Sequence, residues 1–584
     1  MHVRNHELLD AKLKQYLVPA VMMKLALQLG NVVDAMLVGN LLGPEAMSAV
    51  SLASPALSLI QIPGYFLANG GAITAAILLG RRQKKEAKEV FTVTFLITLV
   101  FGLLFTISSF FLTQPMAHLF AKGGSLEPDV AKYVFVCLAG APVLGLGLWL
   151  AFTLAGDSHP QLASAYFIVS NAVNLILDFV FLKYTSLGVT GAALSTMIGF
   201  GIGFVVAIFY VKSPRRMLSF VKPHIDKEIF KKVVSAGMPF LSYLIVAMIR
   251  ALIMNTIVLS LLKEDGMAVF TVCNNTNLIL AMLIGGVVGV IPNIASILYG
   301  EKDYYGIRSI FTKIMRYGLI ITGVLMIVVF ILAKQFTLLF GVKDAQLQTV
   351  MISVLRVYVF AMPFDLWNSF GMQYYGSVEK SPMSTFITVC QNGVFLIPFA
   401  YLGISAGLKI GDYGFIGLGA AFVLSEAITV LASVIFRKIK YKGGSLLLIP
   451  KENPGESLDF TIKADADEVS SVPREIKTFC KEHNIDSSKS NLIAVCAEEM
   501  VLNTVQYGGS KSKWIDVCLM IDKNEDGTDK LMLMIRDNGV PFDPTTYKTG
   551  EDDFDIHGIE LALKVAKDIT YVRAIDLNNT TITV

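Results

Sequence analysis

Residues 90–113 read VFTVTFLITLVFGLLFTISSFFLT and contain no charged side chain. A helix of about 20 apolar residues crosses a bilayer, so this stretch predicts a membrane-spanning helix. The basic run RRQKKEAK at 81–88 precedes it. Lys and Arg are enriched in loops on the inner side of a membrane, and the run predicts such a loop. The number of membrane-spanning helices therefore follows from how often this pattern of an apolar run and a basic loop recurs along the chain.

The composition of the 584-residue chain indicates many such spans. Hydrophobic residues make up 54%, charged residues make up 16%, and mean hydropathy is +0.61. These values exclude a soluble multidomain enzyme, a disordered chain and a coiled-coil rod. A net charge of +3 gives no reason to expect nucleic acid as a partner. The six cysteines have no paired spacing, so neither a disulfide framework nor a zinc site is predicted.

Apolar runs alternate with polar loops over residues 1–442 and predict a polytopic α-helical membrane domain. Twelve spans are expected, at about 16–39, 47–80, 90–113, 130–153, 162–182, 190–211, 234–262, 267–299, 317–333, 348–372, 384–403 and 415–436. Lys and Arg gather in alternate loops and predict that the N- and C-termini are both cytosolic. We expect a multi-pass protein of the cell membrane, in contact with lipid.

The character of the sequence changes near residue 443. Gly and Pro in 443–456 predict a linker, and 457–584 has frequent charges but no run long enough for a span. The expected strands are 457–463, 513–521, 531–537, 569–576 and 579–584; the expected helices are 466–483, 487–507 and 557–567; and a hairpin turn is expected at 524–527. This pattern predicts a cytosolic α+β sandwich, with helices on one face of a mixed sheet.

The membrane domain contains an internal repeat. Pro19 and Pro239 are separated by 220 residues (239 − 19), and so are Gly80 and Gly300 (300 − 80). The repeat predicts two lobes of six spans, at about 1–220 and 221–442. Secondary transporters built in this way hold their substrate between or within the lobes, near the middle of the membrane.

Three features resemble the multidrug and toxic compound extrusion (MATE) transporters. They are LGNVVDAMLVGNLLGPEAMSAV at 29–50, the stretch with NAVNLILDFVFL and LGVTGAALST within 171–196, and the two-lobe repeat. The resemblance covers nearly all of 1–442. It implies a secondary antiporter that exports small organic compounds, driven by Na⁺ or H⁺. The sequence has no GxxxxGK[ST] motif, which agrees with an ion gradient as the energy source.

Ionisable residues inside the expected spans are candidates for the coupling site, because a charge in hydrocarbon is costly. Asp34 lies in the first span, while Asn174 and Asp178 share one face of the fifth. With Thr196 of the sixth span, they offer oxygen atoms suited to Na⁺ or, through raised carboxyl pKa values, to H⁺. The resemblance implies that these four residues form the cation site of the N-lobe.

The C-lobe departs from one branch of the family, which has a glutamate in the seventh span. Here that span has Arg250 instead, and Asp365 and Glu426 lie in the tenth and twelfth spans. Pairing of Arg250 with Asp365 or with Glu426 would neutralise the buried charges. Such a pair is expected to be either a lock between spans or part of an anionic-substrate site.

Two clusters in the soluble part resemble the histidine-kinase-like ATPases, and most closely the anti-sigma-factor serine kinases. They are AEEMVLNTVQYGG at 497–509 and IRDNGVPFDP at 535–544. The resemblance implies that Glu499 is the catalytic base and that Asn503 ligates Mg²⁺ on the phosphates of ATP. It also implies that Asp537 accepts the adenine amino group.

Two glycines complete the implied nucleotide site. Gly539 lets the backbone approach the adenine ring of the nucleotide. Gly558 begins the helix whose N-terminus faces the phosphates. Two residues depart from the family pattern. Pro541 replaces a second glycine that many relatives have, and Glu560 places a carboxylate where the phosphates are expected.

The leading hypothesis is a cation-coupled exporter whose cytosolic domain senses nucleotide or a partner protein. One alternative is a membrane-anchored regulator of the serine-kinase or anti-sigma type, with the membrane domain as its sensor. Such a regulator would phosphorylate or bind a cytosolic regulatory protein. The other alternative is a flippase for a lipid-linked sugar, which only Arg250 favours.

Overall fold

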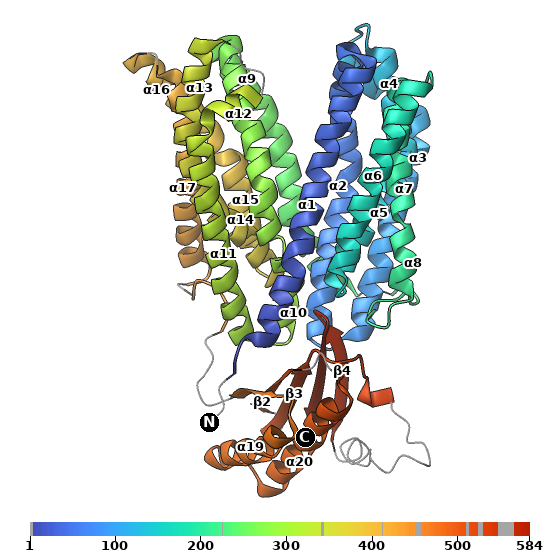
Figure 1. Ribbon diagram of the computed structural model, residues 1–584, viewed down its shortest axis with the longest axis vertical. Coiled ribbons are helices and arrows are strands. Elements are labelled where there is room, and N and C mark those ends of the chain that lie inside the picture. The colour runs from blue at the N-terminus through green and yellow to red at the C-terminus, as the bar shows by residue number, and fades with distance from the viewer. Residues whose placement is uncertain are drawn as a thin grey trace.

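The computed structural model describes residues 4–224, 226–339, 344–411, 413–442, 444–450, 457–509, 513–523, 529–546 and 566–584. The expected turn at 524–527 lies outside these residues. So does nearly all of the expected helix at 557–567, with Gly558 and Glu560. Two helical bundles stand side by side, and a small sheet domain lies at one end of the pair (Figure 1).

The first bundle, the N-lobe, follows the predicted spans. Its helices are α1 (Glu7–Leu42), α2 (Pro44–Gly80), α3 (Lys84–Ala121), α4 (Glu127–Ala139), α5 (Ala141–Gly156), α6 (Pro160–Tyr184), α7 (Val189–Gly203) and α8 (Val205–Val211). The expected fourth span is bent by 53° between α4 and α5. Pro142 stands at the start of α5, where it lacks the backbone N–H that would continue the α4 ladder.

The second bundle, the C-lobe, begins with α9 (Lys227–Val288), which holds the expected seventh span and the first part of the eighth on either side of a break. Its helices are α9 (Lys227–Val288), α10 (Ile291–Gly300), α11 (Tyr304–Ile331), α12 (Ala333–Leu339), α13 (Ala345–Tyr358), η1 (Val359–Ala361), α14 (Met362–Ser377), α15 (Ser381–Val389), η2 (Cys390–Val394), α16 (Leu396–Ile410) and α17 (Gly414–Lys440). Lys263 breaks α9, because its φ of 56° is left-handed.

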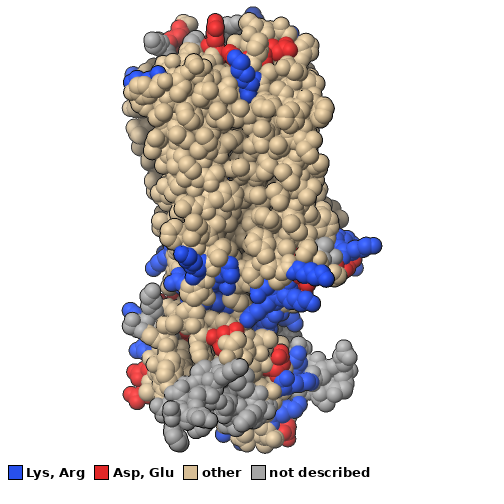
Figure 2. Space-filling view, turned by 90° about the vertical axis from the view of Figure 1, so that its right-hand side faces the viewer, with Lys and Arg blue, Asp and Glu red and all other residues tan. Residues whose placement is uncertain are grey.

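Ten helical stretches of the described residues, some of which join two or three of these elements, are long and apolar enough to cross a membrane, and the bent pair α4–α5 would be an eleventh. The first expected span lies in α1, which runs the length of the bundles (Figure 1). Exposed apolar side chains such as Phe110, Phe111 and Ile331 cover the sides of the bundles. Figure 2 shows Lys and Arg gathered where the bundles meet the sheet domain.

The bundles lie closest together beside the sheet domain and diverge away from it (Figure 1). Glycines permit the close contact. A Cβ atom at Gly70 of α2 would lie 2.3 Å from the Val233 carbonyl oxygen of α9. On the same side, Arg81 of the N-lobe forms an ion pair with Glu379 of the C-lobe at 2.7 Å.

The sheet domain is an α+β sandwich. Its elements are β1 (Ser457–Lys463), α18 (Ala466–Val469), α19 (Ser471–Glu482), α20 (Ser487–Tyr507), β2 (Trp514–Lys523), β3 (Asp529–Asp537), η3 (Pro544–Thr546), β4 (Asp568–Ala574) and β5 (Leu577–Thr583). The strand order is β1-β2-β3-β5-β4, and each described ladder is antiparallel. The prediction of a mixed sheet was therefore wrong, because periodicity identifies strands without giving the direction of their partners.

The two faces of the sheet have different neighbours. Phe460, Val517 and Ile535 pack with Ile476 of α19 and Ile493 of α20 in one apolar core. The opposite face lies against the helical bundles (Figure 1). Neighbouring residues on a strand point to opposite faces, so each strand carries side chains to both surroundings.

Candidate cation and nucleotide sites

The predicted N-lobe residues meet where α1, α6 and α7 come together. Asn174 Nδ2 donates to Thr196 Oγ1 at 3.2 Å and to Ser195 Oγ at 3.3 Å. Ser195 Oγ donates to Asp178 Oδ1, and the Asp178 side chain is fully buried. A Cβ atom at Gly199 would lie 2.5 Å from the Ser170 carbonyl oxygen, so this glycine lets α7 approach α6.

Asp34 of α1 completes the cluster. Its carboxyl neighbours that of Asp178. Within the described part of the chain, Asp34 Oδ1 and Asp178 Oδ2 are buried and have no hydrogen-bond donor. Two adjacent carboxyl groups repel each other when both are ionised. The pair can therefore hold a shared proton or a small cation.

The structure brings together all four residues that the sequence suggested for the N-lobe. It also adds Ser195, which sequence reasoning missed. The signal for Ser195 was weak, because a serine in the run GAALST resembles the other small residues at a helix contact. Its role becomes visible only when α6 and α7 are side by side.

The C-lobe residues Arg250, Asp365 and Glu426 line one cavity. Gln391 Nε2 donates to Asp365 Oδ1 at 2.7 Å and to Glu426 Oε1 at 3.3 Å. The expected ion pair does not form in the described residues, since Arg250 Nη1 instead donates to Asn392 Oδ1 at 3.4 Å. The Gln391 amide, and not Arg250 as predicted, thus binds both Asp365 and Glu426.

A cavity of about 230 Å³ lies at the end of β3 in the sheet domain. It is lined by Met500, Asn503, Thr504, Tyr507, Gly508, Asp537, Val540, Pro541, Phe542, Asn578 and Thr580. Asp537 Oδ1 accepts from Gly539 N at 2.7 Å and from Asn578 Nδ2 at 2.9 Å. Burial raises the pKa of Asp537 against these two hydrogen bonds.

Helix α20 positions two of the predicted residues. Asn503 is buried, and its Nδ2 donates to the Glu499 carbonyl at 2.8 Å. This bond uses the amide nitrogen and leaves Oδ1 as the ligand atom that Asn503 can offer to the cavity. Glu499 is half-buried one turn earlier and is not among the residues that line the cavity. Pro541 is in the cavity wall.

Gly539 is required for packing at this site. A Cβ atom there would lie 2.7 Å from the Gly508 carbonyl oxygen and 2.8 Å from Asp537 Oδ1. Asn578 is the residue that sequence reasoning missed in this site. Its Oδ1 accepts from Tyr571 at 2.7 Å and from Arg573 at 2.6 Å, which fixes the amide against Asp537.

The cavity is chemically suited to an adenine nucleotide. A carboxylate at its base accepts hydrogen bonds, and Met500, Val540 and Phe542 provide apolar walls for a flat ring. Asn503 can offer an oxygen to Mg²⁺. The phosphate-binding residue expected at Gly558 lies outside the described residues.

The two bundles have a two-lobe membrane transporter fold, and the family comparisons agree. The MatE family model matches residues 19–180 and 239–402, and the histidine kinase-like ATPase domain model matches 462–583. The two MatE ranges begin at Pro19 and Pro239, the two prolines whose separation predicts the repeat. The protein belongs to the MatE family of membrane transporters and carries a histidine kinase-like ATPase domain.

A multidrug export protein and two solved structures are among those similar to the membrane domain. The multidrug export protein MepA of Staphylococcus saprophyticus is 24% identical over 428 residues, which cover 72% of this chain and 91% of MepA. A MOP superfamily transporter from Pyrococcus furiosus has a TM-score of 0.67 at 20% identity, covering 73% of this chain and 95% of its own. An outward-facing MATE family transporter has a TM-score of 0.67 at 19% identity, with coverages of 74% and 95%.

Proposed function

We propose that the protein is a cation-coupled antiporter that exports small organic compounds and has a nucleotide-binding regulatory domain. The observation that carries the proposal is the pair Asp34–Asp178, in which two buried carboxylate oxygens lack a donor within the described residues. The multidrug export name of MepA, whose length is matched over 91%, supports export of small organic compounds.

The pair supplies a physical basis for coupling. A proton or Na⁺ neutralises the mutual repulsion of Asp34 and Asp178, and loss of the cation restores it. Helix α1 carries Asp34 and packs against both α6 of the N-lobe and α9 of the C-lobe. A change in the charge of this site therefore acts on a helix that contacts both lobes.

The charge distribution supports a cytosolic position for the sheet domain. Figure 2 shows Lys and Arg concentrated at its junction with the bundles. Lys and Arg are enriched in the cytoplasmic loops of membrane proteins. We therefore place the sheet domain and both termini in the cytosol, and the diverging ends of the bundles on the outer side.

The sheet domain is proposed to bind ATP with Mg²⁺. Asp537 would accept the adenine amino group, Asn503 would ligate the metal, and Gly558 would begin the helix that faces phosphate. Glu499 is assigned the role of base should the bound nucleotide react. Titration of the full-length protein with Mg-ATP tests the nucleotide site separately from transport.

The transport proposal is tested in proteoliposomes that contain the full-length protein and a fluorescent organic cation. Imposed H⁺ and Na⁺ gradients are applied in turn, and substrate movement against its own gradient is recorded. The Asp34→Asn/Asp178→Asn variant should lose gradient-driven movement, because it cannot release and rebind a cation. Glu45→Gln, which changes an exposed acid at the start of α2, is the matched control and should transport normally. Unchanged transport by the double variant would refute the site.

A further inference from the structure

Two polar sites lie back to back across the sheet of the ATPase-like domain. In the antiparallel ladder of β3 and β5, Arg536 pairs with Asn579, and Asp537 pairs with Asn578. Asp537 and Asn578 line the nucleotide cavity. Because adjacent residues point to opposite faces, Arg536 and Asn579 point away from the cavity. Both side chains contact the helical bundles.

The first contact is with the C-lobe. Arg536 donates to Glu301 Oε2 at 2.5 Å and to Asp303 Oδ2 at 2.9 Å, and Asn579 donates to Glu301 Oε1 at 2.5 Å. All four side chains are buried. Glu301 and Asp303 lie between α10 and α11, directly after Gly300. This is the place where α10 packs against α2 of the N-lobe.

Electrostatics at this contact depend on two arginines. Burial alone would raise the pKa of Asp303, but Arg4 and Arg536 outweigh it and hold the pKa below its ordinary value. Arg4, from the segment that precedes α1, donates to Asp303 at 2.6 and 2.9 Å. For Glu301, burial prevails over Arg536 and raises the pKa. Asp303 is therefore the acid whose charge the arginines stabilise most.

The second contact is with the N-lobe. The turn between β4 and β5 contains Ile575 and Asp576, both with left-handed φ angles, of 49° and 57°. Asp576 accepts from Lys12 of α1 at 3.0 Å, and its backbone N–H donates to Ser158 Oγ at 3.1 Å. Ile575 is 1% exposed and belongs to the apolar core of the bundles. Close by, Arg82 donates to Thr581 at 2.8 Å.

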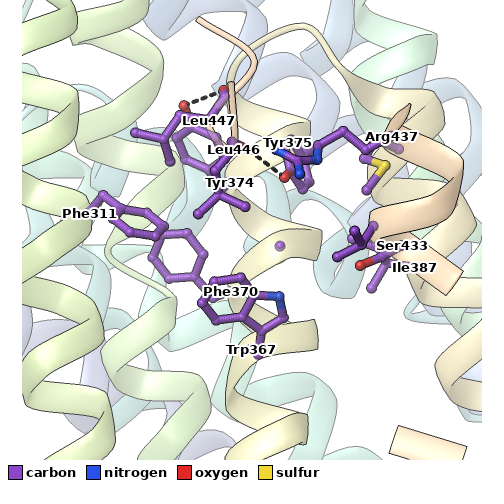
Figure 3. A pocket seen from close by; sticks show the side chains of 13 residues that line it. Phe311, Trp367, Phe370, Tyr374, Tyr375, Ile387, Ser433, Arg437, Leu446 and Leu447 are labelled. Carbon is purple, nitrogen blue, oxygen red and sulfur yellow. Dashed lines mark hydrogen bonds between the residues drawn. The ribbon is translucent and has the colours of Figure 1, made fainter. Parts of the chain in front are cut away.

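The third contact ties the connecting segment to the C-lobe. Leu446 and Leu447 insert between aromatic side chains of α11 and α14, as Figure 3 shows. Tyr374 donates to the Leu447 carbonyl at 2.8 Å, and Tyr375 donates to the Leu446 carbonyl at 2.8 Å. The described part of the predicted linker is thus packed against the bundle, and the sheet domain is held close to the C-lobe.

We propose that the ATPase-like domain is a clamp across both lobes. It binds the C-lobe through Arg536 and the N-lobe through the Asp576 turn, and it holds the lobes together on its own side of the membrane. The lobes can separate there only after these contacts break. The inference rests on the proposed function only in taking the two lobes to move relative to each other during transport.

The chemistry of the contact suits release. A buried ion pair gains little net free energy, because its attraction is largely offset by the loss of hydration. When the domain leaves, Arg536, Glu301 and Asp303 return to water together, and no single charge remains buried alone. Removal of only one partner has a different effect, since it leaves an uncompensated buried charge and opposes docking. Arg536 is a positioning residue, because it holds the sheet domain against the C-lobe.

The proposal is tested by measuring the separation of the lobes in the full-length protein in lipid nanodiscs. Spin labels at Ser125→Cys of the N-lobe and Gln346→Cys of the C-lobe report on the ends remote from the domain, where both residues are exposed. The six native cysteines are buried. The doubly labelled protein without further substitutions should show mainly a long distance between the two labels, because the bundles diverge at that end.

Two variants release the clamp from opposite sides. Arg536→Ala with Asp576→Ala changes the sheet domain, whereas Glu301→Gln with Asp303→Asn leaves that domain unaltered. Asparagine also retains the hydrogen bond by which Asp303 caps α11. Both variants should raise the short-distance population at least threefold and speed amide exchange in β3 and β5. Lys84→Ala removes a half-exposed contact with Asp543 at 3.6 Å and should change neither readout.

Two results would overturn the clamp. One is docking that persists in both variants, seen as unchanged exchange in β3 and β5. The other is faster exchange with an unchanged distance distribution, which would mean that the domain docks without restraining the lobes. The measurement uses neither ATP nor an ion gradient. The distance and exchange measurements would therefore still test the clamp if the proposed transport or nucleotide site proved wrong.

Discussion

Gly80 and Gly300 pack backbone against backbone where the two lobes meet. A Cβ atom at Gly300 would lie 2.3 Å from the Ile77 carbonyl oxygen and 2.9 Å from Gly80 Cα. The two glycines occupy corresponding positions of the repeat, so the duplication supplies both sides of one contact. Arg81 and Glu301 follow them directly and bind partners across the lobe junction and in the sheet domain.

The glycine contact gives the first prediction. Gly300→Ala should lower the free energy of unfolding by roughly 1–3 kcal/mol, because the added methyl group overpacks a rigid backbone contact. Thermal unfolding in detergent measures the change. Gly323→Ala is the matched control, since a Cβ atom there meets nothing within 4 Å. Equal stability of the Gly300 and Gly323 variants would show that the contact is looser than the structure indicates.

A second prediction concerns Ser195, the residue that the sequence did not reveal at the candidate cation site. Ser195→Ala removes the hydroxyl that donates to Asp178 and favours its ionised form. Loss of about 1 kcal/mol of stabilisation of the ionised carboxyl makes protonation easier, so H⁺-driven transport should reach half its maximum at a roughly fivefold lower H⁺ concentration. Ser195→Thr should restore the wild-type value, and Ser186→Ala, at an exposed position, should not change it. An identical cation dependence in Ser195→Ala would remove Ser195 from the site.

A third prediction concerns the nucleotide cavity. Asn503→Ala should abolish saturable Mg-ATP binding by the full-length protein in calorimetric titration, because it removes the proposed metal ligand. Asn578→Ala should weaken binding by roughly five- to tenfold, since Asp537 then loses a hydrogen bond that orients it. Asn491 lies exposed on the same helix as Asn503, and Asn491→Ala is the control. Equal affinities in all three variants would place the nucleotide elsewhere.

A fourth prediction concerns pH and the loop after α5. Asp157 accepts from Tyr210 at 2.6 Å and from the Leu218 backbone N–H at 3.0 Å. Burial raises the pKa of Asp157 to about 7 against these hydrogen bonds. An acid whose pKa is raised on folding favours the folded state while it is protonated, and this advantage declines as pH rises.

The free energy of local opening at Leu218 should therefore fall between about pH 4 and pH 7 and stay level above that range, by roughly 4 kcal/mol at most. This opening free energy is measured by hydrogen exchange of the Leu218 amide, corrected for the intrinsic exchange rate. Asp157→Asn should remove this component. Burial lowers the pKa of the neighbouring His159, which titrates in both proteins, so the difference between them isolates Asp157. The same slope in both proteins would contradict the assignment.

The lobes and most of the candidate site could be predicted because their signals are local. The repeat separation appears in Pro19 and Pro239, and the spacing of Asn174 and Asp178 already places them on one helical face. Asp34 was conspicuous as a carboxylate in an apolar run.

The docking interface could not be predicted, because its residues look ordinary in the sequence. Glu301 and Asp303 resemble loop charges, and Arg536 resembles any polar residue that alternates along a strand. Their significance arises only when segments more than 200 residues apart meet. For the same reason, the position of Arg250 in the sequence did not reveal that an amide, Gln391, bridges Asp365 and Glu426.

The proposed coupling requires that Asp34 and Asp178 hold the cation that drives export. Its most direct test is cation release from the purified full-length protein on addition of substrate, without any gradient. A pH-sensitive dye in weak buffer follows H⁺, and radioactive Na⁺ follows sodium. We expect substrate to displace one of these ions from the wild-type protein and neither from Asp34→Asn/Asp178→Asn. Release of equal size from the double variant would contradict it.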